Sequence, residues 1–230
     1  MKTSLCGLKQ TESVADNIMI HGRTAKDHKK GLIDFLDRCL AEGITLAMHK
    51  VTLCQKEILW FGYIFGRDGV RPDPVKVQKL KEKGVPKSQE EVRSFLQAAQ
   101  FNARFMWDTD GAYSHITQPL RKLLGKNIRF EWGSEQQSSY DEIIDALESA
   151  GALYPYNPNL EIGHIADAQP TGIASSVYMI TEEGQGQRIW WPLNHISRSL
   201  TPTESSYPQI DRESLAQAWD MRQQRWYLIG

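Results

Sequence analysis

The sequence contains few cysteines and no long apolar segment. Only three cysteines occur among 230 residues, Cys6, Cys39 and Cys54, and none of them stands in C-x-x-C spacing. An odd number of isolated cysteines argues against a disulfide framework and against a zinc knuckle, so we expect buried or idle thiols. The longest apolar stretch, residues 58–65, is far shorter than the roughly 18 residues of a membrane span. We therefore expect no contact with a membrane.

Several signatures of other protein classes are also missing. The first residues, MKTSLCGLKQTES, contain no apolar segment of roughly seven residues, so we expect no secretory signal and an intracellular protein. The six histidines show neither H-E-x-x-H nor His-x-His spacing, and no Ser-His-Asp or Cys-His arrangement is indicated. Gly184 and Gly186 are an isolated pair of glycines in a turn, which is not enough to indicate a phosphate-binding loop.

What is present is an ordinary globular composition with an uneven charge distribution. Hydrophobic residues make up 40% and charged residues 24% of a chain long enough for one large or two small domains. Residues 1–133 carry 22 Lys and Arg against 15 Asp and Glu, whereas residues 134–230 carry 5 against 13. Such a split fits a protein that binds a polyanion with one part and assembles metal-binding carboxylates with the other, although two unrelated solvated surfaces would give the same numbers.

The first 70 residues predict a strand, a helix and two further strands. Residues 14–20 form a short β-rich segment that Asp16 and Asn17 interrupt, and residues 27–40 place leucines and isoleucine at helical spacing before Gly43, a plausible C-cap. Residues 44–48 and 58–66 read as strands, and the second ends at a turn with the sequence Asp68-Gly69.

The middle of the chain predicts a helical part that is rich in basic residues. The prolines at positions 72 and 74 mark a boundary, because each one removes a backbone donor and favours an extended preceding residue. Ser88 followed by Glu91 predicts a helix start, and an apolar stripe follows it. That stripe consists of Val92, Phe95, Leu96, Ala99, Ala103 and Met106.

The last 70 residues predict three strands and a helix. Residues 160–167, 172–180 and 188–196 read as an antiparallel meander, with residues 183–186 as the turn between the second and third strands. Ser206 and Pro208 then predict the start of a helix that runs to about residue 228.

The order of six motifs resembles the reverse transcriptase and RNase H region of gypsy-type LTR retrotransposon Pol polyproteins, over residues 12–230. VADNIMIHGRTAKDHKKGL resembles the Y-x-D-D hairpin and the following helix, and GITLAMHK resembles GLTLN-x-x-K. ILWFGYIFGRDGVRPDPVKV is similar to the F-L-G-H-x-I-S-x-x-G-I-x-P-D-P-x-K-V run, and EVRSFLQAAQFNARFM to ELRSFLGL with Y-Y-R-R-F-I. IADAQPTGIASSVYM is similar to TDAS-x-x-GIGAVL, and HISRSLTPTESSYPQIDRESLAQAW to SR-x-L-x-x-x-E-x-x-Y-x-x-x-E-x-E-x-LA.

The resemblance implies an α+β, α/β fold of several subdomains. Residues 1–73 would form the C-terminal part of a reverse transcriptase palm, and residues 74–158 a helical thumb and connection. Residues 159–230 would form the N-terminal part of an RNase H-like domain, a truncated mixed sheet with one helix. The boundaries agree with those indicated by the prolines and the change of periodicity.

The resemblance places part of a polymerase metal site at Asp16. A palm holds two magnesium ions with carboxylates, because phosphoryl transfer depends on charge and position. Here the second aspartate of the pair is Asn17, a neutral amide, and Val14 replaces the aromatic residue of the motif. The alternative is that Asp16 and Asn17 are ordinary turn residues. We predict no nucleotide incorporation by this chain.

Two further segments correspond to nucleic-acid contacts of the family. Trp60, Phe61, Gly62 and Tyr63 fall on its primer grip, where aromatic rings and glycine suit close contact with a nucleotide, although strand aromatics are more often core residues. A cationic segment that could bind phosphates follows, and the alternative is a solvated surface. Its basic residues are Arg71, Lys76, Lys79, Lys81, Lys83 and Lys87.

The resemblance assigns RNase H metal ligands to Asp167 and Glu213. Asp211 competes with Glu213 for this role. Residues two positions apart on a helix point in directions that differ by about 200°, so only one of these two side chains can face Asp167. The E-x-L-A register selects Glu213. Gln169 replaces the serine of the family's motif. The family's next aspartate lies on a later strand that this chain does not contain, so the metal site is predicted to be incomplete and the sheet to have an exposed edge.

Two functions follow as hypotheses. The first is a fragment or degenerate copy of a reverse transcriptase and RNase H that uses Mg²⁺ or Mn²⁺ and is weakly active or inactive alone. The second is a non-enzymatic nucleic-acid-binding or interaction protein built on that scaffold. The expected partners are an RNA–DNA hybrid or a primer–template duplex, and the remaining polyprotein domains.

Overall fold

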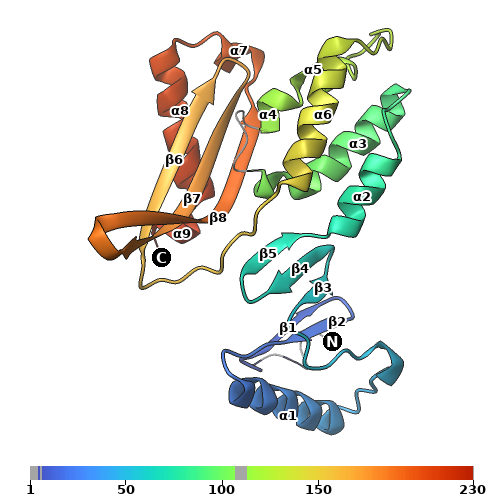
Figure 1. Ribbon diagram of the computed structural model, residues 1–230, viewed down its shortest axis with the longest axis vertical. Helices are drawn as coiled ribbons and strands as arrows, with labels where there is room; N and C mark the ends of the chain where they lie inside the picture. Colours follow the sequence, from blue (N-terminus) through green and yellow to red (C-terminus); the bar gives the residue numbers. More distant parts are fainter. Residues whose placement is uncertain (1–4, 6, 107–112, 230) are drawn as a thin grey trace. The chain divides into compact units, whose positions relative to one another are not determined.

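A computed structural model of the chain describes residue 5, residues 7–106 and residues 113–229, and Cys6 lies outside them. The chain divides into two compact units, Met1–Gln55 and Lys56–Gly230 (Figure 1). Among the described residues, no helix has the length and apolar character needed to cross a bilayer.

The first unit is a β-hairpin with one helix. Strands β1 (Thr11–Val14) and β2 (Asn17–Ile20) pair antiparallel, so the interruption predicted at Asp16 and Asn17 is the hairpin turn and the first residue of β2. Helix α1 (Ala25–Ala41) begins at Thr24, whose Oγ accepts a hydrogen bond from the Asp27 N–H. The predicted helix is confirmed, and Gly43 follows its end with a positive φ of 66°.

The strand predicted at residues 44–48 is wrong. This segment is irregular and leads into the 3₁₀ turn η1 (Met48–Lys50). The N–H of Ile44 donates to the carbonyl of Cys39 and closes the end of α1, so this donor is not available to a sheet. Ile44 and Leu46 still pack on a small core that contains the buried Phe35 and Cys39. The apolar residues therefore serve packing without strand pairing.

The second unit begins with three strands, where a single strand at residues 58–66 was predicted before the turn. Residues 58–66 divide into β3 (Ile58–Trp60) and β4 (Tyr63–Gly66). The predicted hairpin turn is present one residue earlier than expected, at Arg67 and Asp68, and Gly69 begins β5 (Gly69–Pro72). Phe61 and Gly62 have φ angles of 52° and 82°, which are typical of a two-residue hairpin turn that needs positive φ at both positions. The prediction failed because Phe61 is not a residue that signals such a turn.

A helical part follows, and its apolar residues form the main hydrophobic core of this unit. Ser88 begins the predicted helix, as its Oγ accepts from the Glu91 N–H, and the whole predicted apolar stripe is buried. The elements are α2 (Pro74–Glu82), α3 (Gln89–Asn102), η2 (Ala103–Phe105), α4 (Tyr113–Ile116), α5 (Gln118–Lys122) and α6 (Ser134–Glu148).

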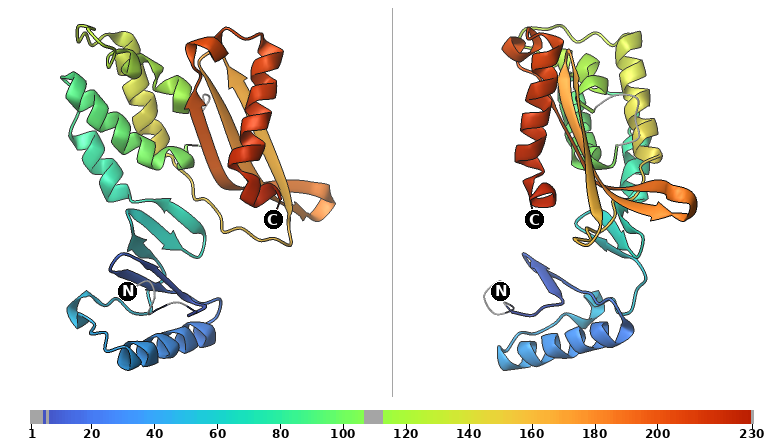
Figure 2. Two further views of the ribbon diagram at one scale, coloured as in Figure 1. Left: turned by 180° about the vertical axis from the view of Figure 1, so that it is seen from behind. Right: turned by 90° about the vertical axis from the view of Figure 1, so that its left-hand side faces the viewer.

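A meander of three strands completes the sheet architecture. Strands β6 (Glu161–Gln169), β7 (Gly172–Glu183) and β8 (Gln187–Ser199) lie in that order, with the 3₁₀ turn η3 (Gly184–Gly186) between the last two. The predicted meander is confirmed, but the predicted mixed sheet is wrong, since all pairings among the described residues are antiparallel. Figure 2 shows α8 on one face of this sheet and the shorter helices of the middle segment on the other.

The C-terminal helix differs from its prediction at both ends. A short helix α7 (Pro202–Ser205) precedes α8 (Gln209–Gln223), and the helix breaks at Gln224 before α9 (Arg225–Leu228). Ser206 does not cap α8, because its Oγ donates to the Thr203 carbonyl and Pro208 occupies the cap position. The capping box is at Thr201 and Glu204 instead.

Candidate functional site

Glu213 lies at the unpaired outer edge of β6. One Oε of its carboxylate accepts a hydrogen bond of 2.9 Å from the Gln209 side-chain amide, and the same amide donates to the Ala168 carbonyl at 3.0 Å. Gln169 pairs with Gly172 across a two-residue turn, so the alternation of an antiparallel ladder directs the Ala168 carbonyl away from β7. The polar groups of the first turns of α8 therefore meet the free edge of β6.

Asp167 is exposed and lies at the same end of β6. Ala168 is buried against Ala216 of α8, so the alternation of side chains along a strand puts Asp167 on the other face of the strand. β6 is an edge strand of the sheet, so side chains on both of its faces lie next to the edge where Gln209 and Glu213 are found. The structure thus brings Asp167 and Glu213 to one end of one strand, on either side of its free edge.

These two residues provide the type of donor that Mg²⁺ prefers, which is carboxylate oxygen. In the part of the chain that the structure describes, no group of three or more His, Cys, Asp and Glu side chains could hold a metal ion. Mg²⁺ commonly binds through one or two carboxylates and keeps several waters. Two carboxylates match the protein ligands of one hydrated ion in number and chemistry, and they are too few for a two-ion site.

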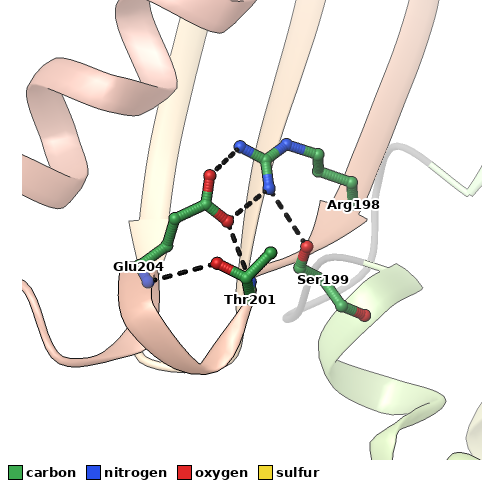
Figure 3. Close-up of polar contacts among 4 residues, drawn as sticks. All are labelled: Arg198, Ser199, Thr201 and Glu204. Atoms are coloured by element: carbon green, nitrogen blue, oxygen red, sulfur yellow. Dashed lines mark hydrogen bonds and ion pairs between the residues drawn. The ribbon is translucent and has the colours of Figure 1, made fainter.

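A clamp between Arg198 and Glu204 holds the segment that leads into α8 (Figure 3). The two terminal nitrogens of Arg198, at the end of β8, each donate to one carboxylate oxygen of Glu204 at 2.8 Å. Glu204 also accepts from the Thr201 N–H, and its own N–H donates to the Thr201 Oγ. The hydrogen bonds from Arg198 and from the Thr201 N–H lower the pKa of Glu204 to about 2. The clamp is therefore ionised at any pH used for enzyme assays.

A buried polar network, which we did not predict, lies between α8 and the sheet. Asp220 is fully buried, and its two carboxylate oxygens lie 2.5 Å from Ser175 Oγ and 2.5 Å from His164 Nδ1. Gln224 connects Ser175 to Asn194 by two further hydrogen bonds. Asp220 stands one helical turn after the buried Ala216, so a charged residue on the apolar face was the signal available in the sequence.

The proposed primer-grip residues form a compact aromatic turn. The Tyr63 ring stacks on Phe101 of α3 with centroids 4.6 Å apart, and the Tyr63 hydroxyl donates to the Phe101 carbonyl. Lys76 Nζ lies 5.6 Å from the centre of the Phe101 ring, next to the turn at Gly62. Phe61 is 43% exposed at the tip of the turn. Trp60 is half-buried and contacts Phe61 edge to face.

The basic residues of β5 and α2 divide into those whose side chains form ion pairs and those whose side chains do not. Arg71 binds Glu57 and Lys81 binds Glu148, each in an ion pair with a carboxylate. Lys79 and Lys83 are exposed, and no described residue forms a hydrogen bond or an ion pair with their side-chain ammonium groups. At 100° per residue, Lys76, Lys79 and Lys83 share one face of α2, whereas Lys81 lies on another. Only the first three form the candidate phosphate-binding row.

Asp16 lies in the first unit, exposed in the turn between β1 and β2. Asp167 and Glu213 belong to the second unit.

The chain is similar to known proteins in both sequence and fold. Residues 132–230 match the family described as the RNase H-like domain found in reverse transcriptase. The chain is 24% identical to the transposon Tf2-7 polyprotein of Schizosaccharomyces pombe over 99% of its own length and 17% of that polyprotein. It is also 24% identical to the Tf2-3 polyprotein, over 93% of its length and 15% of that relative.

The fold is similar to that of foamy viral reverse transcriptases. A foamy viral protease-reverse transcriptase in complex with double-stranded DNA matches 99% of this chain and 39% of its own, with a TM-score of 0.82 and 20% identity. The same type of enzyme with an RNA/DNA hybrid gives a TM-score of 0.79 and 21% identity over 96% of this chain and 29% of its own.

The fold and the matched segment define the class as a mixed α/β protein with an RNase H-like domain. The predicted resemblance to retrotransposon Pol polyproteins is confirmed: residues 132–230 match the RNase H-like family of reverse transcriptases, and nearly the whole chain is similar to the Tf2 polyproteins. The chain spans about a sixth of the length of these relatives.

Proposed function

We propose that this chain binds an RNA–DNA hybrid or a primer–template duplex and holds a divalent cation at the edge of β6. Its parent would be a gypsy-type LTR retrotransposon polyprotein that copies RNA into DNA and degrades the RNA strand. The observation that carries the proposal is that Gln209 joins the Glu213 carboxylate to the carbonyl of Ala168, the residue that follows Asp167 in β6. The proposed parts remain a palm end at 1–73, a thumb and connection at 74–158, and an RNase H portion at 159–230.

Asp167 and Glu213 would hold one hydrated Mg²⁺ or Mn²⁺. A bound ion supplies positive charge that activates water and stabilises the scissile phosphate. The two carboxylates bind and orient it, with their exposed positions leaving room for a substrate phosphate. Because the described residues provide no ligands for a second ion, we propose weak or absent cleavage of RNA by the isolated chain.

The duplex would lie on the surface formed by the β3–β4 turn and the lysine row of α2. Phe61 and Phe101 offer exposed rings for base or sugar contact, and Lys76, Lys79 and Lys83 offer charge to the phosphates. Arg71 and Lys81 are proposed as structural ion pairs that support this surface, because their charges are already matched.

The salt dependence of duplex binding tests this surface. We expect the double variant K79E/K83E to bind a hybrid more weakly and to lower the slope of log K against log salt by about two, since each lost phosphate contact contributes roughly 0.9. The matched control is K122E/K126E, which reverses two exposed lysines elsewhere in the same unit. Equal effects of both double variants would show that only net charge matters and would reject the surface.

Two activity assays separate the enzyme from the binding module. Cleavage of a labelled hybrid in Mn²⁺ that disappears in Asp167→Asn would support a residual nuclease. Binding without any cleavage favours the non-enzymatic alternative, which the unpaired lysine row already supports. Templated extension of a primer would contradict our expectation that Asp16 is insufficient for a polymerase site.

A further inference from the structure

Gln209 is the residue that joins the Glu213 carboxylate to the sheet. Its amide nitrogen donates both to Glu213 and to the Ala168 carbonyl. Its carbonyl oxygen accepts a hydrogen bond of 2.7 Å from the guanidinium of Arg212. Because the oxygen is used by a donor, the nitrogen must face Glu213 and the strand. The orientation of the amide is therefore determined by Arg212.

Arg212 is itself held by the segment that the clamp fixes. Another terminal nitrogen of Arg212 donates to the Ser205 carbonyl, the last residue of α7. Glu204 of the same short helix is bound by both terminal nitrogens of Arg198. Arg198 also lies over the Trp219 ring of α8, 5.9 Å from its centre. A continuous series of contacts thus runs from the end of β8 to Gln209.

We propose that Gln209 is a positioning residue for Glu213, and that Arg212 and the Arg198–Glu204 clamp fix its orientation. The inference rests on the proposed role of Glu213 as a metal ligand. Gln209 donates to one carboxylate oxygen of Glu213, and no residue within the described ranges forms a hydrogen bond with the other oxygen. Hydrogen-bonding partners of this kind hold a ligating carboxylate in one rotamer, and their loss commonly weakens metal binding about 10- to 100-fold.

A titration with Mn²⁺ alone, followed by the electron paramagnetic resonance signal of free Mn²⁺, tests the proposal on the full chain. Gln209→Ala should weaken Mn²⁺ binding about 10-fold or more. Arg212→Met keeps Gln209 but removes the guanidinium that donates to its carbonyl oxygen. This variant should also weaken Mn²⁺ binding, by a smaller factor. The matched control is Gln217→Ala, the same change at an exposed glutamine of α8. Equal affinity of Gln209→Ala and wild type would overturn the positioning role.

If the wild type binds no Mn²⁺, the proposed metal site is rejected. A second measurement then tests the contacts of Gln209 independently of any metal. The side-chain amide resonances of Gln209 in a ¹H–¹⁵N spectrum report its hydrogen bonds directly. Glu213→Ala and Arg212→Met should each shift them, and Gln217→Ala should not. Unchanged Gln209 resonances in both variants would show that the contacts are absent and would overturn the inference, whatever the metal does.

Discussion

At the scale of single residues, two buried polar side chains stand out on opposite faces of the β6–β8 sheet. Asp220 of α8 faces the sheet and is paired with Ser175 and His164. His195 is 7% exposed, and its Nδ1 lies 2.7 Å from Ser176 Oγ. Burial of polar groups costs free energy unless their partners stay in place, so both residues make the sheet sensitive to small changes.

Removal of the Asp220 carboxylate should destabilise the second unit. Asp220→Ala leaves the Ser175 hydroxyl without its acceptor and creates a cavity, so we expect a loss of about 3 kcal/mol in the free energy of unfolding. Asp220→Asn, which keeps an acceptor for Ser175, should lose less. All seven tryptophans lie in residues 56–230, so tryptophan fluorescence in urea reports this unit. Asp211→Ala, at an exposed site of the same helix, is the control and should change little.

His195 should make the stability of this unit depend on pH. Burial lowers the pKa of His195 from 6.5 to about 4. The unfolded chain therefore binds a proton between pH 6.5 and 4 that the folded protein does not bind, so stability is full above pH 6.5 and falls as the pH decreases toward 4. The expected loss is on the order of 3 kcal/mol. His195→Gln should remove this part of the slope, and the exposed His115→Gln should retain it; equal slopes in both variants would contradict the assignment.

At the scale of elements, the turn of the β3–β4 hairpin holds a residue type that suits neither its backbone conformation nor its exposure to solvent. Phe61 occupies a left-handed conformation with φ of 52°, which non-glycine residues rarely adopt. The same ring is exposed at the tip of the turn. A strained exposed aromatic is consistent with selection for contact rather than for stability.

Phe61→Asn should separate these two effects. Asparagine tolerates positive φ, so the variant should be more stable by about 1 kcal/mol in urea unfolding, while its affinity for a hybrid should fall because a ring is lost. Leu59→Asn, at an exposed strand position beside the turn, is the comparison for a general loss of apolar surface. Reduced stability together with unchanged affinity of Phe61→Asn would contradict the assigned role of the turn.

The sequence predicted most elements because their signals are local. The apolar stripe that begins in α3 at Val92 and continues past its end to Met106, and the hairpin signal at Asp68 and Gly69, needed only neighbouring residues. Residues 44–48 failed, since an apolar segment becomes a strand only where another strand offers an edge. Gln209 was missed for a similar reason: its partners Ala168, Arg212 and Glu213 come together only after α8 packs on β6.

At the scale of the whole molecule, the motif order and the relatives indicate the same class of protein. The order of six motifs predicted the retrotransposon class over nearly the whole chain, and the relatives confirm it at 24% identity. Identity that low does not transfer an activity residue by residue. The proposed site therefore depends on geometry: Glu213 is joined through Gln209 to the edge of β6, and Asp167 lies at the same end of that strand. The chain spans 17% of those polyproteins.

The most direct test is a double-mutant cycle of Mn²⁺ affinity, measured by calorimetry on wild type, Asp167→Asn, Glu213→Gln and the double variant. If both carboxylates hold one ion, each single change should weaken binding by a similar factor, and the double variant should be little worse than either one. Independent, additive losses, or a wild-type affinity that neither change affects, would contradict a shared site at the edge of β6.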